Sequence, residues 1–77
     1  MAYEEVYEEK RKFVEGELTE MLRAATGGYV ERCEYEREGG EETVHVFMAI
    51  QPVGVNVTAD SPWGIAKDVM RALAERY

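Results

Sequence analysis

The stretch at residues 29–51 reads YVERCEYEREGGEETVHVFMAIQ and decides the fold. Apolar and polar side chains alternate on either side of Gly39-Gly40, which is the pattern of a β-hairpin. Two consecutive glycines suit a two-residue turn in which both residues need a positive φ. This turn predicts the pairs Arg32–Phe47, Cys33–Val46, Glu34–His45, Tyr35–Val44 and, far from the turn, Tyr29–Ile50.

The predicted register separates two chemically different faces of the hairpin. Cys33, Tyr35 and their partners form an apolar face, while the other face carries a cation–π pair and an acid–imidazole pair. A shift by one residue would destroy this match on both faces, and the match therefore supports the predicted register. The residues expected on a sheet face without cover are Val30, Arg32, Phe47, Ala49, Gly54 and Asn56.

Apolar residues at helical spacing flank the hairpin on both sides. Residues 3–25 predict one amphipathic helix that ends at Thr26-Gly27-Gly28, with Gly16 indicating close packing or a bend. Its apolar stripe contains Tyr3, Val6, Tyr7, Phe13, Val14, Leu18, Met21, Leu22 and Ala25, and Lys10 occupies a position of the same stripe.

The remaining chain predicts a strand at residues 53–58 and a helix at residues 62–76. Ser61 is expected as the N-cap, with Pro62 at the first helical position. We therefore expect a single domain over residues 1–77, with the hairpin at residues 29–51. Its class is α+β in the order α-β-β-β-α, with a three-stranded antiparallel meander sheet and both helices on one face.

The chain is acidic, with 16 Asp and Glu against 9 Lys and Arg, a formal net charge of −7. All of the excess lies in residues 1–52, because residues 53–77 carry three acids and three bases. This balance speaks against direct binding of nucleic acid, which requires phosphate neutralisation. No apolar stretch reaches the length of a membrane span, and no signal peptide is recognisable. One cysteine, Cys33, fits a reducing compartment, so we expect a cytoplasmic protein.

The excess charge of the hairpin suggests a site. We predict an acidic ridge that stands in for nucleic-acid phosphates and binds a cationic partner. The expected partner-binding residues are Glu31, Glu34, Glu36, Glu38, Glu41, Glu42 and Phe47. The alternative is that the acidity serves solubility only.

The sequence contains no set of residues suited to catalysis. The register places His45 and Cys33 on opposite faces of the sheet, and His45 with glutamates alone makes a poor metal site. A cap at Asp60 and a solvated position at Asp68 explain these two acids. We expect no enzyme, no catalytic residue, no metal and no cofactor. Trp63 is expected in the core, with an exposed binding hot spot as the alternative.

The order of elements and the length resemble the double-stranded RNA-binding domain. That family carries a lysine cluster at the start of its last helix, where this chain has Ser61-Pro62-Trp63-Gly64-Ile65-Ala66 and then Lys67. The departure removes the phosphate-binding residues, so RNA binding is not expected.

Residues 55–61, VNVTADS, followed by Ile65 and Asp68-Val69, look like small proteins of phages and mobile elements. In size, charge and topology the chain is similar to anti-CRISPR inhibitors, some of which occupy a nucleic-acid cleft with surface carboxylates. The resemblance implies a non-enzymatic, phage-type inhibitor that mimics DNA and binds a basic nucleic-acid-binding protein such as a CRISPR effector. It also implies that the cytoplasm in which the protein acts is that of a bacterial host cell. The alternative is a small homodimeric structural or assembly protein that uses the open sheet face.

Overall fold

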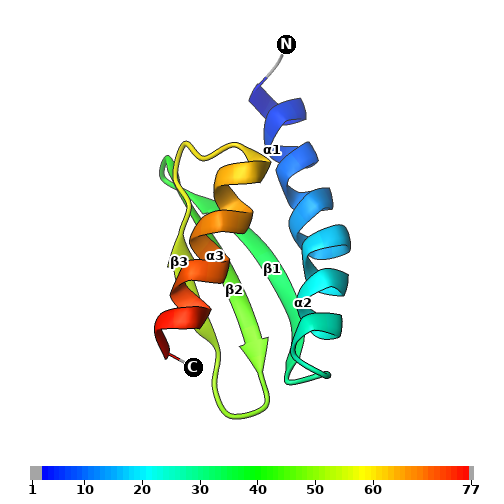
Figure 1. Cartoon of the computed structure of the whole chain (residues 1–77). Coiled ribbons are helices and arrows are strands. Elements are labelled where there is room, and N and C mark those ends of the chain that lie inside the picture. The colour runs from blue at the N-terminus through cyan, green and yellow to red at the C-terminus, as the bar shows by residue number, and fades with distance from the viewer. Residues whose placement is uncertain (1–2, 77) are drawn as a thin grey trace.

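The computed structural model describes residues 3–76, with helices packed on one face of a three-stranded sheet (Figure 1). A continuous helix consists of α1 (Tyr3–Lys12), the π-helical turn η1 (Phe13–Leu18) and α2 (Thr19–Ala25). The strands β1 (Val30–Glu38), β2 (Glu41–Met48) and β3 (Val53–Asn56) follow, and α3 (Pro62–Arg76) ends the described chain. The sheet is antiparallel in the order β1-β2-β3, so the predicted class and element order are confirmed.

The hairpin turn has the predicted geometry. Gly39 and Gly40 have φ values of 58° and 84°, which only glycine adopts at little cost in both positions. The register that follows is the predicted one from Glu38–Glu41 as far as Arg32–Phe47.

The register changes beyond Arg32. A β-bulge lies between Val30 and Arg32, and Val30 pairs with Met48, so the predicted Tyr29–Ile50 pair is wrong. A bulge inserts one residue and thereby exchanges the two faces of the strand. Val30 is consequently fully buried on the core face, and its predicted place on the uncovered face is also wrong.

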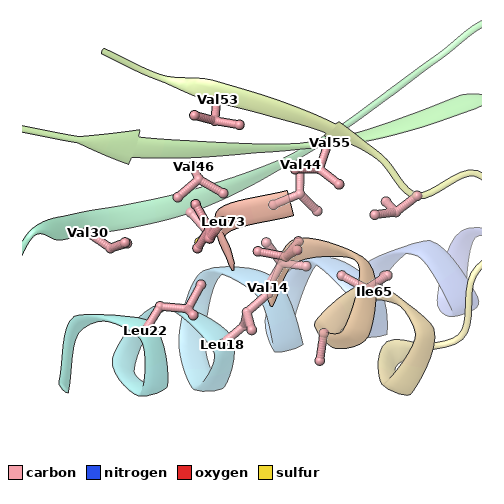
Figure 2. Packing of buried hydrophobic residues seen from close by; sticks show 14 of the residues in the cluster. Val14, Leu18, Leu22, Val30, Val44, Val46, Val53, Val55, Ile65 and Leu73 are labelled. Carbon is pink, nitrogen blue, oxygen red and sulfur yellow. The ribbon is translucent and has the colours of Figure 1, made fainter. Parts of the chain in front are cut away.

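The core lies between the sheet and the two helices. Figure 2 shows Val14, Leu18 and Leu22 of the first helix pointing toward the sheet, which presents Val44 and Val46. From α3, Ile65, Ala66, Val69 and Leu73 complete the cluster. The strand predicted at residues 53–58 ends at Asn56, whose side-chain oxygen accepts the Thr58 N–H and turns the chain.

The π-turn aligns an unusual stripe. Lys10, Val14, Leu18 and Leu22 are all buried and recur every four residues. In a regular α-helix of 3.6 residues per turn, this spacing would drift by about 120° over the twelve residues. The wider π-turn at residues 13–18 takes up much of that drift and keeps the four side chains on one face. A Cβ at Gly16 would meet nothing within 4 Å, so this glycine does not serve close packing.

The same helix covers the outer edge of β1. The Cys33 N–H donates to Thr19 Oγ1 at 2.9 Å, and the Tyr35 N–H donates to Glu15 Oε2 at 3.2 Å. Arg11 Nη1 donates to the Tyr35 carbonyl oxygen at 3.0 Å. Backbone groups that an edge strand would leave open to other chains are therefore occupied by helix side chains.

Within residues 3–76, no helix has both the length and the apolar character that crossing a membrane requires.

Candidate protein-binding surface at the hairpin end

The predicted acidic ridge lies largely on the uncovered face of the sheet. Glu34, Glu36 and Glu38 alternate along β1 and are exposed, and Glu41 continues the row at the start of β2. Glu31 is also exposed, but it belongs to the bulge at the opposite end of β1. The ridge is thus concentrated toward the Gly39-Gly40 turn.

Glu42 is not part of this ridge, and its predicted place there is wrong. The residue is only 3% exposed. It pairs with Arg37 across the hairpin and precedes Val44 by two positions, so it lies on the core face. The prediction followed its charge, whereas the alternation of the strand decides its direction.

Two of the remaining ridge carboxylates have cationic or imidazole neighbours. Glu34 Oε2 lies 2.8 Å from Nε of Arg32, and Glu36 Oε1 lies 3.0 Å from Nε2 of His45. The acid–imidazole pair therefore joins His45 to the diagonal neighbour Glu36 and not to Glu34 directly opposite. Both pairs are surface contacts, which contribute little to stability.

Glu38 and Glu41 lie next to the turn, where the ridge ends. They face each other directly in the register, and neither has an ion-pair partner among residues 3–76. With Glu36 and Thr43 they line a crevice of about 150 Å³ on the uncovered face. Together, Glu36, Glu38 and Glu41 make up the acidic tip of the hairpin.

The predicted contact residue Phe47 is already covered. The guanidinium of Arg32 lies 4.1 Å from the centre of the Phe47 ring, which confirms the predicted cation–π pair. The ring is half-buried. The open sheet face therefore presents charged and polar groups to solvent more than it presents an aromatic platform.

A buried polar cluster lies directly beneath the hairpin end. Lys10 Nζ lies 2.8 Å from Glu42 Oε1, and both residues are almost completely buried. The Tyr35 hydroxyl donates to the same oxygen, and the Ala59 N–H donates to Glu42 Oε2 at 2.9 Å. One carboxylate thus joins α1, β1, β2 and the loop before α3.

The surroundings of Glu42 and Tyr35 shift the pKa values of both groups. Burial alone would raise the pKa of the Glu42 carboxyl, but hydrogen bonds from Lys10, Tyr35 and the Ala59 N–H outweigh it and lower the pKa. Burial, together with the bond to ionised Glu42, raises the pKa of the Tyr35 hydroxyl. The cluster is therefore a stable ion pair with a neutral tyrosine, which suits a structural role.

A second carboxyl at this end is poorly satisfied. Asp60 Oδ2 is buried and has no hydrogen-bond partner among the described residues. The nearby Asp68 carboxyl, followed by burial, raises the pKa of Asp60, with Lys10 opposing and Glu42 adding to the effect. Ser61 caps the N-terminus of α3 as predicted, since its Oγ accepts the Gly64 N–H at 3.2 Å. Asp60 is therefore not needed as a cap.

This arrangement predicts a pH dependence of stability. Folding raises the pKa of the Asp60 carboxyl. The stability that the protonated carboxyl contributes is therefore complete below the unfolded pKa of about 3.8 and is lost as the pH rises through the folded pKa. We expect Asp60→Asn to gain stability relative to the wild type between about pH 4 and pH 7. Urea denaturation across this range measures the difference. Glu75→Gln, at an exposed site without an ion pair among residues 3–76, is the control, and a difference independent of pH would contradict the expectation.

The described residues bring together no recognisable catalytic group. Cys33 is buried, and burial raises the pKa of its thiol despite the opposing hydrogen bond with Thr19. His45 lies on the other face of the sheet. Residues 3–76 also contain no group of three or more His, Cys, Asp or Glu that could hold a metal ion.

A larger hollow lies at the other end of the molecule. It has a volume of about 620 Å³ and is lined by Thr26, Tyr29, Met48, Leu73 and Ala74. These described lining residues supply no carboxylate, imidazole, amine or thiol, so the hollow offers no acid–base pair suited to catalysis near neutral pH.

Sequence reasoning missed two residues at the hairpin end. Lys10 is buried, and its signal was a lysine on an otherwise apolar stripe. Trp63 is 74% exposed, so its expected place in the core is wrong. It precedes Ile65 by two positions, or about 200° around the helix, which turns it away from the buried stripe of α3.

Comparison of the chain with protein families, with curated proteins and with solved structures finds no match.

Proposed function

We propose that this chain is a non-enzymatic binding protein that docks its hairpin end on a basic nucleic-acid-binding protein. The acidic tip takes the place of nucleic-acid phosphates, in the manner implied by the resemblance to anti-CRISPR inhibitors, and a CRISPR effector is the partner class that this resemblance suggests. The observation that carries the proposal is the unneutralised pair of Glu38 and Glu41, directly opposite each other across the turn.

Like charges directly opposite on neighbouring strands destabilise a hairpin. A lysine at either position would turn this repulsion into an attraction, yet the hairpin sequence contains no lysine, and its arginines are Arg32 and Arg37. A pair that costs stability and serves no contact of the fold fits a role toward something outside the molecule.

The first helix extends the negative field on the same end of the molecule. Glu5 and Glu9 of α1 are exposed and have no ion pair among residues 3–76. Figure 1 shows the start of α1, the hairpin turn and the start of α3 at one end of the fold. Carboxylates gathered at one end accelerate the capture of a cationic surface and disfavour acidic partners.

The proposal predicts that neutralising the tip removes partner binding. We expect Glu38→Gln/Glu41→Gln to retain less than about a tenth of the basic proteins that the wild type captures from a bacterial lysate. The captured proteins should be released by salt and by competing DNA. The same variant should be about 0.5 kcal/mol more stable, because the repulsion across the turn is gone.

Glu17→Gln/Glu20→Gln is the matched control for this experiment. It removes the same charge from exposed positions of the first helix, away from the hairpin turn. If this control loses its partners equally, net charge and not the acidic tip is responsible, and the proposal is wrong. Capture that is indifferent to salt contradicts phosphate mimicry.

A second candidate is a homodimer formed along the sheet. The outer edge of β1 is covered by Arg11, Glu15 and Thr19, whereas β3, at the other edge, has no such row of helix side chains within residues 3–76. An uncovered edge strand can pair with a second copy. Light scattering of the purified chain distinguishes this candidate, and Phe47→Asp tests whether the open face contributes.

A further inference from the structure

The outer edge of β3 carries backbone groups that the fold does not use. Along an antiparallel strand, successive residues turn their N–H and C=O groups alternately toward one neighbour and toward the other side. The Val57 N–H donates to the Glu42 carbonyl oxygen at 2.9 Å, in the register of β2 and β3. The alternation therefore leaves the backbone N–H and C=O groups of Gly54 and Asn56 at the outer edge of the sheet. Figure 1 shows this edge on the side of the fold away from the first helix.

The opposite edge of the sheet agrees with this alternation. Continued across β2, it turns the N–H groups of Cys33 and Tyr35 to the outer edge of β1. These are the two N–H groups that Thr19 and Glu15 of the first helix bind. The corresponding groups of β3 have no loop, turn or side-chain hydrogen bond within residues 3–76. The fold thus closes one edge of its sheet and leaves the other open.

No charge guards the open edge. Proteins commonly protect an edge strand with charged side chains, because these disfavour pairing with another chain. Residues 46–59 contain no Asp, Glu, Lys or Arg, although the chain as a whole has a formal net charge of −7. Gly54 has no side chain, and the Asn56 side chain is held by the Thr58 N–H, which donates to its Oδ1 at 3.1 Å. Neither charge nor a long side chain of β3 therefore opposes an added strand.

We infer that β3 pairs antiparallel with β3 of a second copy of this chain, with Gly54 opposite Asn56 of the second copy. In this register each of the two residues donates its N–H and accepts through its C=O, which gives four hydrogen bonds across the interface. The two-fold axis passes between the two Val55 residues. The inference rests on the second candidate function, to which it gives a register, and it does not depend on the acidic tip.

The distribution of charge and of closed edges favours a second copy over a strand of another protein. Two chains of charge −7 repel each other, so they meet most easily where neither is charged, and residues 46–59 provide such a stretch. The two-fold axis places the two acidic tips at opposite ends of the pair. The joined sheet has β1 at both outer edges, where side chains of the first helix cover it. Assembly therefore stops at two copies.

Gly54→Pro tests this interface. Proline removes an N–H that the fold does not use, but it takes two of the four bonds from the interface and places a ring carbon at the edge. Light scattering of the wild type should approach twice the 8.8 kDa of one chain as its concentration rises. Gly54→Pro should raise the dissociation constant about tenfold or more. Gly54→Ala is the matched control, because it keeps the N–H and its Cβ would lie 3.8 Å from Thr43 Cγ2.

Hydrogen exchange of the wild type decides the matter if Gly54→Pro does not fold. The Gly54 and Asn56 amides should exchange more slowly as the protein concentration rises, and unchanged rates overturn the inference. A wild type that stays at the mass of one chain overturns it too, as does a folded Gly54→Pro that associates as tightly as Gly54→Ala. Salt should strengthen this association by screening the repulsion, whereas it weakens capture by the acidic tip. Failure of the pairing therefore leaves the role of the tip standing, and the reverse also holds.

Discussion

Replacing Lys10 by methionine is expected to lower the free energy of unfolding by about 3–5 kcal/mol. Methionine fills much of the same volume but leaves Glu42 as a buried charge, with only the Tyr35 hydroxyl and the Ala59 N–H bonded to it. A domain of this size has a total stability of about 5–15 kcal/mol, so the variant should be close to unfolding at room temperature. Urea denaturation followed by circular dichroism measures the loss.

A double variant distinguishes the charge from the packing. Glutamine at position 42 carries no charge; its amide oxygen can accept the Ala59 N–H, and its NH2 group can donate to the Tyr35 hydroxyl oxygen. Lys10→Met/Glu42→Gln should therefore recover part of the loss. Lys12→Met is the control, because Lys12 is an exposed neighbour on the same helix. A loss below about 1 kcal/mol for Lys10→Met would show that the ion pair does not support the fold.

Thr19→Val is the second large effect, with an expected loss of about 2 kcal/mol. The Thr19 hydroxyl donates to the Val14 carbonyl oxygen at 2.9 Å and accepts the Cys33 N–H at 2.9 Å. Valine has the same shape but offers neither bond, so a buried N–H on the edge of β1 loses its partner. Denaturation measures the stability, and hydrogen exchange at the Cys33 amide should become faster.

Thr43→Val provides the matched control for this change. Thr43 is a half-buried threonine of β2 whose hydroxyl makes no side-chain hydrogen bond within residues 3–76. Its replacement should change stability by less than about 0.5 kcal/mol. If both variants lose the same amount, the bond between Thr19 and β1 is not what joins the helix to the strand.

The hairpin was predictable because its information is local. Two glycines in sequence define the turn, and alternation on both sides defines the register within the reach of that turn. The bulge at Val30 was not predictable in this way, since it depends on which residue the helices bury. The core needs an apolar side chain at this position, and the strand obtains it by inserting Glu31.

For the buried charged residues, the sequence indicated where each one lies but not which one it pairs with. The alternation of β2 already placed Glu42 with Val44 on the core face, and Lys10 already stood on the apolar stripe of the first helix. Two opposite charges at core positions are the sequence signal of a buried ion pair. Their contact joins residues 32 positions apart, so only the packed structure could show that each is the other's partner.

By itself, the sequence determined the order of the elements, the position of the turn and the excess of acid in residues 1–52. These follow from residue spacing and composition, which need no knowledge of distant contacts. The tertiary structure alone decided which carboxylates remain without a partner and that Trp63 faces water. Exposure and neutralisation depend on what packs against each side chain, and that is set by contacts between elements far apart in the chain.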